Sequence, residues 1–577
     1  MVAPIRDAAT VPLEAPALVA GAGTALWLGL DGAVLNLSLP DAALRARHGP
    51  PPILCHAPLA AKRLGIARFA ALDVLELHAF VRPTRACVPT VRGLAAALGL
   101  ERPRDLAAEV QALPAIARAL LSELASLEER DEAALIADRM AAAGWSWGTH
   151  AVAALERTGA PGEAEAARPE LAGFAVWRKL PSWSEHAPES PPGSQPVLPT
   201  EARRRLVELL ARDRAAREDA PETRSPVEPR PQQADYASAV TAAFTPRERR
   251  GVPRFVLAEA GTGVGKTLGY IAPASLWAEK NGGPVWISTY TRNLQHQIDG
   301  ELDRLHPDPL TKARRVVIRK GRENYLCLLN MDEAVAGARL DGREVIALGL
   351  IARWAAETRD GDMIGGDFPS WLADLVGRAR TLDLRDHRGE CVYSACPHYH
   401  KCFIEGSIRR ARRAEIVVAN HALVMAQAAL GGLDDGTVPQ RYVFDEGHHV
   451  FDAADGAFSA YLSGAEMAEL RRWVLGREDR RRSRARGLKR RTGDLALGDA
   501  EAEQAIEEAE SGARALPDEG WPTRVTGPEP RGPAERFLAL VRETVYARAP
   551  EPLGPYGLEC EPRPTAAGLL KASAALE

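Results

Sequence analysis

The sequence is poor in cysteine, carries little net charge and has no long apolar run. Its 7 cysteines are too few for a disulfide scaffold in a chain of 577 residues, and four of them fall in one quarter of it. This usage favours a metal or cluster site in a reducing cytoplasm. The formal net charge of -4 gives no overall attraction for phosphates, so any nucleic acid would be held by local basic patches.

The best candidate for a membrane segment, Ala15 to Leu30, is preceded by Asp7 and Glu14 and followed by Asp31. It is shorter than the roughly 20 residues of a membrane-spanning helix, and its acidic flanks do not suit a secretory signal. We therefore expect no membrane association. The hydrophobic fraction of 46% and the charged fraction of 26% are typical of globular domains and exclude wholesale disorder, collagen-like repeats and a coiled coil.

The length predicts several domains, three or four at about 150 residues per domain. A strand-like run from Thr24 to Leu39 and helical periodicity after Val91 predict an N-terminal domain that is α/β or mostly helical. Six prolines between residues 181 and 200 predict a linker, and the segment from Glu201 to Glu218 inside it has a helical pattern. The expected organisation is an N-terminal domain at 1–178, a linker at 179–229, a domain at 230–451 and a last segment at 452–577.

Two blocks of opposite charge follow one another in the last segment. Residues 477–491 are rich in arginine, and residues 501–510 are rich in glutamate. We expect a solvated loop or two helices that pair with each other, and a contact with the DNA backbone is the alternative.

A Gly-rich loop lies between an apolar run, 255–259, which we expect to be a buried strand, and an apolar helix-like segment. Strand, loop and helix follow in the order of a phosphate-binding loop, whose backbone N–H groups turn toward phosphates at a helix N-terminus. Lys266 would contact the β and γ phosphates, and the Thr267 hydroxyl would bind Mg²⁺. The first position of the strict pattern is Ala260 and not glycine. A Gly-rich turn that merely precedes a helix is the alternative. The loop consists of Ala260, Gly261, Thr262, Gly263, Val264, Gly265, Lys266 and Thr267.

A second apolar run, 441–444, ends in Asp445 and Glu446. Alone, such a pair is commonly a helix start. Together with the phosphate loop, it predicts that Asp445 binds Mg²⁺, directly or through water, and that Glu446 orients the attacking water as a general base. The adjacent His448 and His449 cannot act as zinc ligands one helical turn apart.

Four cysteines form a pattern typical of a metal site. Three lie close together, and the fourth comes from a distant part of the chain, so the four thiolates can close around an iron–sulfur cluster. Zinc is the alternative, with His398 or His400 as a substitute ligand, and the spacing alone does not decide between them. The four are Cys327, Cys391, Cys396 and Cys402.

Taken together, these motifs resemble the DinG/XPD family of iron–sulfur ATP-dependent DNA helicases of superfamily two. EAGTGVGKT, KGRENYLC, the three clustered cysteines, VVANHALV and FDEGHH occur in that family's order, and the resemblance runs from about Arg230 to Phe451. It implies an α/β, RecA-like P-loop domain with a parallel sheet flanked by helices and an iron–sulfur insertion at about 320–410. It also favours a 4Fe-4S cluster over zinc.

The activity implied by the resemblance is ATP hydrolysis coupled to 5′ to 3′ movement on single-stranded DNA and to unwinding, in repair or replication. The expected cofactors are a 4Fe-4S cluster and Mg²⁺, with ATP as substrate and single-stranded and forked DNA as partners. A monomeric cytoplasmic protein associated with the nucleoid is expected.

The resemblance also assigns roles to further residues. Gln233 resembles the adenine-reading glutamine, whose amide would hydrogen-bond the base. The hydroxyls and backbone of residues 288–291, which precede Gln297, would contact DNA phosphates. Four arginines after Cys402 would line the DNA path, with a plain solvated helix as the alternative. They are Arg409, Arg410, Arg412 and Arg413.

The chain departs from the family after Phe451. No copy of the second motor domain, with its arginine finger, is recognisable, and residues 452–577 leave room for part of a helical arch-like insertion. An arginine finger contributes a factor of roughly 10³ to 10⁵ to phosphoryl transfer. The alternative is therefore a truncated or accessory ATP- and DNA-binding protein with little hydrolysis of its own.

The N-terminal domain faintly resembles the exonuclease domain of some family members. The resemblance covers the segments 53–65, 71–80 and 90–100. Asp31 and Asp73 remain, without the paired carboxylates that two metal ions need. We expect a degenerate nuclease-like fold, with an unrelated helical domain as the alternative.

Overall fold

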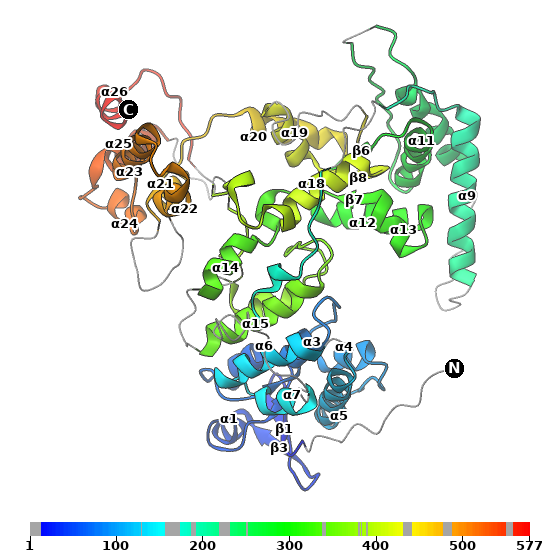
Figure 1. The fold of residues 1–577 in the computed structure, drawn as a ribbon, viewed down its shortest axis with the longest axis vertical. Coiled ribbons are helices and arrows are strands. Elements are labelled where there is room, and N and C mark those ends of the chain that lie inside the picture. Colours follow the sequence, from blue (N-terminus) through cyan, green and yellow to red (C-terminus); the bar gives the residue numbers. More distant parts are fainter. Residues whose placement is uncertain are drawn as a thin grey trace. The chain divides into compact units, whose positions relative to one another are not determined.

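The computed structural model describes most of the chain and divides it into two compact units (Figure 1). Unit 1 comprises Met1–Leu328, Ala338–Arg385 and His398–Ser459, and unit 2 comprises Leu329–Gly337, Asp386–Pro397 and Ala460–Glu577. The described residues are 13–128, 130–155, 173–185, 192–218, 231–249, 252–336, 342–378, 381, 383–387, 390–430, 441–476, 487–549 and 558–577. None of the helices in these ranges is long and apolar enough to cross a membrane.

The N-terminal part of unit 1 is α/β, the first of the two expected alternatives. Its five-stranded sheet has the order β3-β2-β1-β4-β5, with β1, β2 and β3 antiparallel and β4 and β5 parallel to β1. The expected strand-like run is a hairpin, because the chain turns at Gly29 to Ala33. The strands are β1 (Ala17–Ala20), β2 (Thr24–Leu28), β3 (Val34–Ser38), β4 (Ile53–Leu54) and β5 (Leu72–Asp73).

Helices cover this sheet and contribute to its core. The longest, α5, buries Leu113, Ile116 and Leu120 completely, at the three- and four-residue spacing of one helix face. The register of the sheet places Asp31, in the β2–β3 turn, at the end opposite Asp73, so the two carboxylates cannot share a metal ion. The helices are α1 (Leu39–His48), α2 (Ala57–Leu64), α3 (Val74–Val81), α4 (Val91–Ala97), α5 (Leu106–Ala125), α6 (Arg130–Ala142) and α7 (Gly148–Leu155).

A second sheet in unit 1 is entirely parallel, as expected for the predicted P-loop domain. Its order is β7-β8-β6-β9, and all five residues of β6 are buried, as is usual for a strand covered on both faces. Val285 and Ile287 face a core shared with α9, α11 and α12, whereas Trp286 faces a core shared with α18 and α19. The strands are β6 (Val285–Thr289), β7 (Val316–Ile318), β8 (Ile416–Asn420) and β9 (Tyr442–Phe444).

Several helices surround this parallel sheet (Figure 1). They are α9 (Pro199–Glu218), α10 (Pro231–Ala239), α11 (Lys266–Asn281), α12 (Arg292–Leu305), α13 (Pro309–Arg315), α18 (Phe403–Arg413), α19 (His421–Ala429) and α20 (Val450–Phe458).

The strand expected at 255–259 is absent from the structure. These residues pair with no strand, and Phe255 and Leu257 are 80% and 99% exposed. A strand needs a neighbour to receive its backbone hydrogen bonds, and among the described residues β9 pairs only with β6. The apolar composition of the run therefore did not suffice to predict its structure.

The helix expected in the linker, α9, packs into the core of the parallel-sheet domain. Ala202, Leu206 and Leu209 are buried in the same cluster as Trp277 of α11 and Ile287 of β6. Arg205 also pairs with Glu279 of α11 at 2.7 Å. The ordered core of this domain therefore begins upstream of residue 230.

The region between β7 and α18 contains α15 (Gly342–Glu357) and α16 (Ser370–Val376), which pack against the N-terminal part of unit 1. The guanidinium of Arg353 on α15 donates to the carbonyl of Phe80 at 3.1 Å. The indole of Trp371 on α16 donates to the carbonyl of Cys87, also at 3.1 Å. These contacts attach the region between β7 and α18 to the N-terminal part of unit 1.

Unit 2 is helical in its described residues, as expected for 452–577. Lys489 of α22 (Leu488–Ala496) pairs with Glu507 of α23 (Ala500–Ala513) at 3.6 Å, which matches the expectation of two pairing helices. Residues 477–486 of the basic block lie outside the described residues. Its helices are α14 (Leu328–Ala336, from Leu329 on), α21 (Gly464–Leu475), α22 (Leu488–Ala496), α23 (Ala500–Ala513), α24 (Trp521–Thr526), α25 (Gly532–Arg548) and α26 (Ala567–Leu576).

The packing of α9 predicts a stability effect. Leu206→Ala should destabilise the parallel-sheet domain by roughly 2 to 5 kcal/mol, because Leu206 is 2% exposed in its core. Val207→Ala, on the same helix but 64% exposed, should change the stability by less than about 0.5 kcal/mol. Hydrogen exchange of the α11 and β6 amides measures both, and equal effects of the two variants would show that α9 is only a linker.

Candidate nucleotide-binding site

The Gly-rich loop leads directly into α11, which begins at Lys266. Gly263 and Gly265 have φ angles of 82° and 88°, a region that residues with a Cβ rarely adopt. A Cβ on Gly265 would also lie 2.2 Å from the Gln233 side-chain nitrogen, so this position requires glycine for two reasons. The expected loop-to-helix transition is therefore present, although no strand precedes it.

Gln233 lies behind the loop in this structure. Its side chain is 4% exposed, and its amide nitrogen donates to the carbonyl of Gly265 at 2.8 Å. That nitrogen is thus already used by the loop, and the expected contact with adenine stays a prediction. Arg230, where the resemblance begins, lies outside the described residues.

The acidic pair follows β9 beside the loop. The Asp445 amide donates to the carbonyl of Ser288 at 2.8 Å, which extends the pairing of β9 with β6 by one step. Lys266 Nζ lies 3.4 Å from Glu446 Oε1, and the Thr289 hydroxyl donates to Asp445 Oδ2 at 3.2 Å. Lys266, Asp445 and Glu446 therefore come together as the sequence predicts.

The environment of Asp445 raises the pKa of its carboxyl. The main cause is burial, and the neighbouring Glu446 adds to it, whereas the Thr289 hydroxyl and Lys266 oppose it. A divalent cation would stabilise the ionised carboxylate, as would any positive charge placed beside it. Glu446 itself has a left-handed backbone with φ of 52°, which is unusual for a residue with a side chain and typical of functional turns.

Tyr270 is a residue of this site that the sequence analysis missed. It is 3% exposed, its hydroxyl lies beside Thr267 and Asp445, and it makes no well-formed hydrogen bond. Burial raises the pKa of this phenol well above its ordinary value, with Asp445 adding to the effect, so the hydroxyl keeps its proton. Helical spacing could have identified this residue, because Tyr270 follows Lys266 by four residues on α11 and so lies on the same helix face.

Among residues 288–291, the structure corrects the expected DNA contact for the hydroxyls of Ser288 and Thr289, whereas Tyr290 and Thr291 are exposed and for them it stays a prediction. Ser288 and Thr289 are completely buried, and their hydroxyls bond to His421 Nδ1 at 2.7 Å and to Asp445. Thr291 accepts the Leu294 amide as the cap of α12. Because successive strand residues point to opposite faces and β6 is covered on both, the Ser288 and Thr289 side chains cannot reach solvent.

Two further residues lie near the acidic pair: His421, to which the sequence analysis assigned no role, and Tyr290, which belongs to the segment 288–291. His421, in the VVANHALV motif, is 1% exposed, and burial lowers the pKa of its ring, which is therefore neutral at pH 7. Tyr290 is 47% exposed and stacks on His449 with ring centroids 3.8 Å apart. His421 links β6 to the start of α19, and Tyr290 together with His449 offers an aromatic surface near the acidic pair.

The four candidate cluster ligands are thiols outside any disulfide, with Cys327 and Cys402 in unit 1 and Cys391 and Cys396 in unit 2. Cys391 Sγ accepts the Tyr393 amide at 3.4 Å, and the amides of Ile404 and Glu405 bond to Cys402. Such N–H···S bonds suit cluster-ligand sulfurs. Burial raises the pKa of the Cys402 thiol to about 11. Among the described residues, no three His, Cys, Asp or Glu side chains lie close enough together to hold a metal ion, so the cluster stays a prediction.

Arg409 is engaged within the protein, contrary to the expectation that it lines a DNA path. Its guanidinium lies 3.5 Å above the Trp183 ring and pairs with Glu405 at 2.8 Å and with Glu185. The Trp183 indole also donates to the carbonyl of Tyr399 at 2.8 Å. Residues 173–185 are thereby attached to α18, on which Arg410 remains exposed.

A parallel α/β sheet with a glycine loop at a helix N-terminus, a lysine in the first turn and an Asp-Glu pair after a neighbouring strand defines the P-loop class of domain. No family model matches the chain. Curated relatives confirm the resemblance to DinG-type helicases over about two fifths of it.

The ATP-dependent DNA helicase YoaA of Escherichia coli is 34% identical over 251 residues, which make up 42% of this chain and 36% of that protein. The ATP-dependent helicase DinG of Mycobacterium tuberculosis is 32% identical over 257 residues, 41% of this chain and 36% of that protein. The 3′-5′ exonuclease DinG of Bacillus subtilis is 32% identical over 227 residues, which cover 37% of this chain and 22% of that protein. The chain thus spans about a third, or less, of the length of these relatives.

The unsatisfied hydroxyl of Tyr270 predicts opposite effects on stability and on binding. Tyr270→Phe should leave the free energy of unfolding unchanged or raise it by about 1 kcal/mol, because it removes a buried polar group without a partner. It should weaken Mg²⁺-dependent binding of a fluorescent ATP analogue roughly tenfold, since it removes a donor beside Asp445. Tyr461→Phe, at a position 78% exposed, is the control, and unchanged binding by Tyr270→Phe would exclude a role for the hydroxyl.

Proposed function

We propose that this chain binds Mg²⁺·ATP at the loop 260–267 and uses its hydrolysis in DNA unwinding, as an ATP-dependent DNA helicase of the iron–sulfur type. The observation that carries the proposal is the meeting of Lys266, Thr289, Asp445 and Glu446 at the N-terminus of α11. The names of the relatives support both ATP dependence and DNA as the substrate. Hydrolase activity, helicase activity and DNA binding of the whole protein are part of the proposal.

The residues of the site suggest how the reaction proceeds. The backbone N–H groups of the loop and the N-terminus of α11 would hold the phosphates, and Lys266 would contact the β and γ groups. Lys266 now lies 3.4 Å from Glu446, so ATP would draw the lysine toward the phosphates and leave Glu446 to orient the attacking water. When bound, Mg²⁺ neutralises charge on the phosphates, and Thr267 and Asp445 would hold it.

The remaining proposals come from the resemblance alone. They are movement 5′ to 3′ on single-stranded DNA, preference for forked substrates, a role in repair or replication, a monomeric state, and a cytoplasmic, nucleoid-associated location. The second candidate is an accessory protein that binds ATP and DNA but hydrolyses little ATP. The rate of ATP hydrolysis distinguishes the two candidates, whereas ATP binding does not.

The proposal predicts the effect of removing the loop lysine. Lys266→Ala should reduce single-stranded-DNA-stimulated ATP hydrolysis at least about a hundredfold, because the lysine charge acts on the transferring phosphoryl group. Lys571→Ala, the same change at an exposed position in α26, should leave the rate unchanged. Equal rates for wild type and Lys266→Ala would overturn the proposed site. Tight ATP binding by the wild type without turnover would favour the accessory function.

The proposed cluster predicts a colour. Protein purified without oxygen should be brown, with iron and sulfide in equal amounts, because four thiolates of this spacing suit a 4Fe-4S cluster. Cys402→Ser should lose most of the visible absorption, whereas Cys560→Ser, far from the cysteine motif, should retain it. A colourless wild-type protein with one equivalent of zinc would decide for the zinc alternative.

A further inference from the structure

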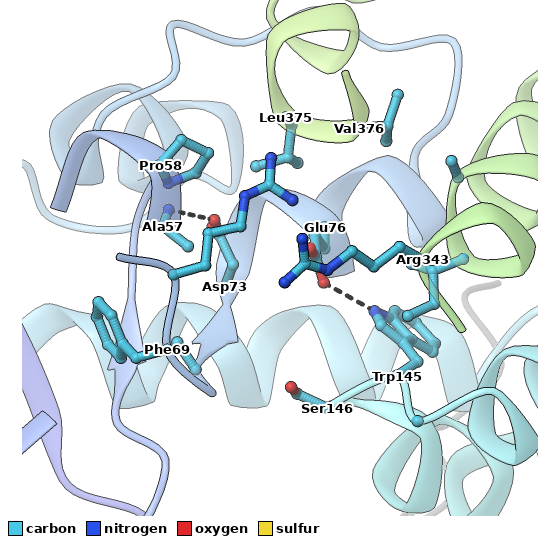
Figure 2. Close-up of a pocket in the computed structure, with 15 residues that line it drawn as sticks. Ala57, Pro58, Phe69, Asp73, Glu76, Trp145, Ser146, Arg343, Leu375 and Val376 are labelled. Atoms are coloured by element: carbon cyan, nitrogen blue, oxygen red, sulfur yellow. Dashed lines mark hydrogen bonds between the residues drawn. The ribbon is translucent and has the colours of Figure 1, made fainter. Parts of the chain in front are cut away.

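A cavity of about 160 Å³ lies in unit 1, away from the proposed ATP site. It forms where the end of β5, the start of α3, the turn before α7 and the helices α15 and α16 meet (Figure 2). A single buried water needs only about 15 Å³, so this space holds considerably more than one water. Its polar lining consists chiefly of Arg68, Asp73, Glu76, Ser146 and Arg343.

Both oxygens of the Asp73 carboxylate accept hydrogen bonds from backbone amides. Its carboxylate accepts the amides of His56 and Leu75 at 3.0 Å and the amide of Ala57 at 2.5 Å. These bonds tie the end of β5 to the start of α2, which Figure 2 shows beside the cavity. The carboxylate of Asp73 therefore has a structural role, and it makes no ion pair with Arg68 or Arg343.

Glu76 does not neutralise the arginines either. One of its oxygens accepts the Trp145 indole N–H at 3.0 Å (Figure 2). Burial, with a contribution from Asp73, raises the pKa of its carboxyl to about 8, so at neutral pH the group retains its proton. A protonated carboxyl offers an O–H donor and no charge.

Arg68 and Arg343 thus line the cavity without a carboxylate within 4.0 Å among the described residues. Both are exposed, so they are reached from solvent. Arg343 comes from the first turn of α15, and a Cβ on the preceding Gly342 would lie 2.1 Å from the carbonyl of Ala143. This close approach fixes the positive end of the α15 dipole beside the cavity.

The charges around the cavity favour an anion. The net charge that faces the cavity is positive. Arg68 and Arg343 contribute two positive charges, the Asp73 carboxylate is bonded to three amides, and the Glu76 carboxyl is neutral. Guanidinium groups bind phosphate oxygens with paired, parallel hydrogen bonds and do so more specifically than an ammonium group. Phe69 and Trp145 add apolar surface to the wall of the cavity.

We propose that this cavity is a second anion site of the protein, which takes a phosphate or phosphomonoester group between Arg68 and Arg343. The group is either free phosphate or the phosphorylated end of a nucleic acid, since both present the same oxygens. A bound group would connect the N-terminal sheet to α15 through its two arginines. The site is independent of ATP hydrolysis at the loop 260–267.

The test is isothermal titration of the full chain with inorganic phosphate. It is made in a Lys266→Ala background, so that the nucleotide loop does not contribute. One saturable site is expected, and Arg68→Gln or Arg343→Gln should weaken it at least tenfold. Arg47→Gln, an exposed arginine on α1 in the same part of unit 1, should leave the affinity unchanged.

Two comparisons complete the experiment. Unfolding curves of the variants establish that they are folded, and Arg68→Lys, which keeps the charge but not the paired donors, should weaken phosphate binding less than Arg68→Gln does. A 5′-phosphorylated oligonucleotide that binds tighter than its 5′-hydroxyl form only when both arginines are present identifies a nucleic-acid end as the source. Equal binding of the two oligonucleotides identifies free phosphate. Phosphate binding that is unaffected by either arginine substitution would overturn the proposal.

Discussion

The parallel pairing of β6 with β9 is the constraint on which the candidate nucleotide site depends. It places Ser288 opposite Phe444, so that Thr289 and Asp445, the next residues of the two strands, meet at the carboxyl edge of the sheet. The α11 helix packs on the same sheet through Trp277, which fixes Lys266 at that edge. Because the side chains of a strand alternate, a slip of one residue would turn Asp445 away from the loop.

The motifs near this edge could be predicted because each is contained in a short stretch of sequence. The loop 260–267 and the pair Asp445–Glu446 carry their chemistry in adjacent residues, and the parallel sheet was implied by the family resemblance that these motifs carry. Tyr270 could also have been found, from helical spacing alone. Outside these motifs, the inferences that failed were ones that depend on a distant partner. Residues 255–259 have a strand composition but no neighbour.

The same limit applies to side-chain roles. The hydroxyls of Ser288 and Thr289 were assigned to DNA, but their partners His421 and Asp445 lie more than a hundred residues further along the chain. Arg409 was assigned to DNA as well, and it is held by residues of the linker. The cavity around Glu76 combines five separate segments, 57–58, 68–76, 144–146, 343–347 and 375–376, so no local pattern could have indicated it.

The two anchored stretches on either side of the proline-rich segment change how the chain responds to a protease. Residues 173–185 are held to α18 through Trp183 and Arg409, and α9 is held in the core beside α11. A single cut between these stretches would leave each new end bound through buried contacts. The nicked fragments would therefore copurify, and they would separate only under denaturing conditions.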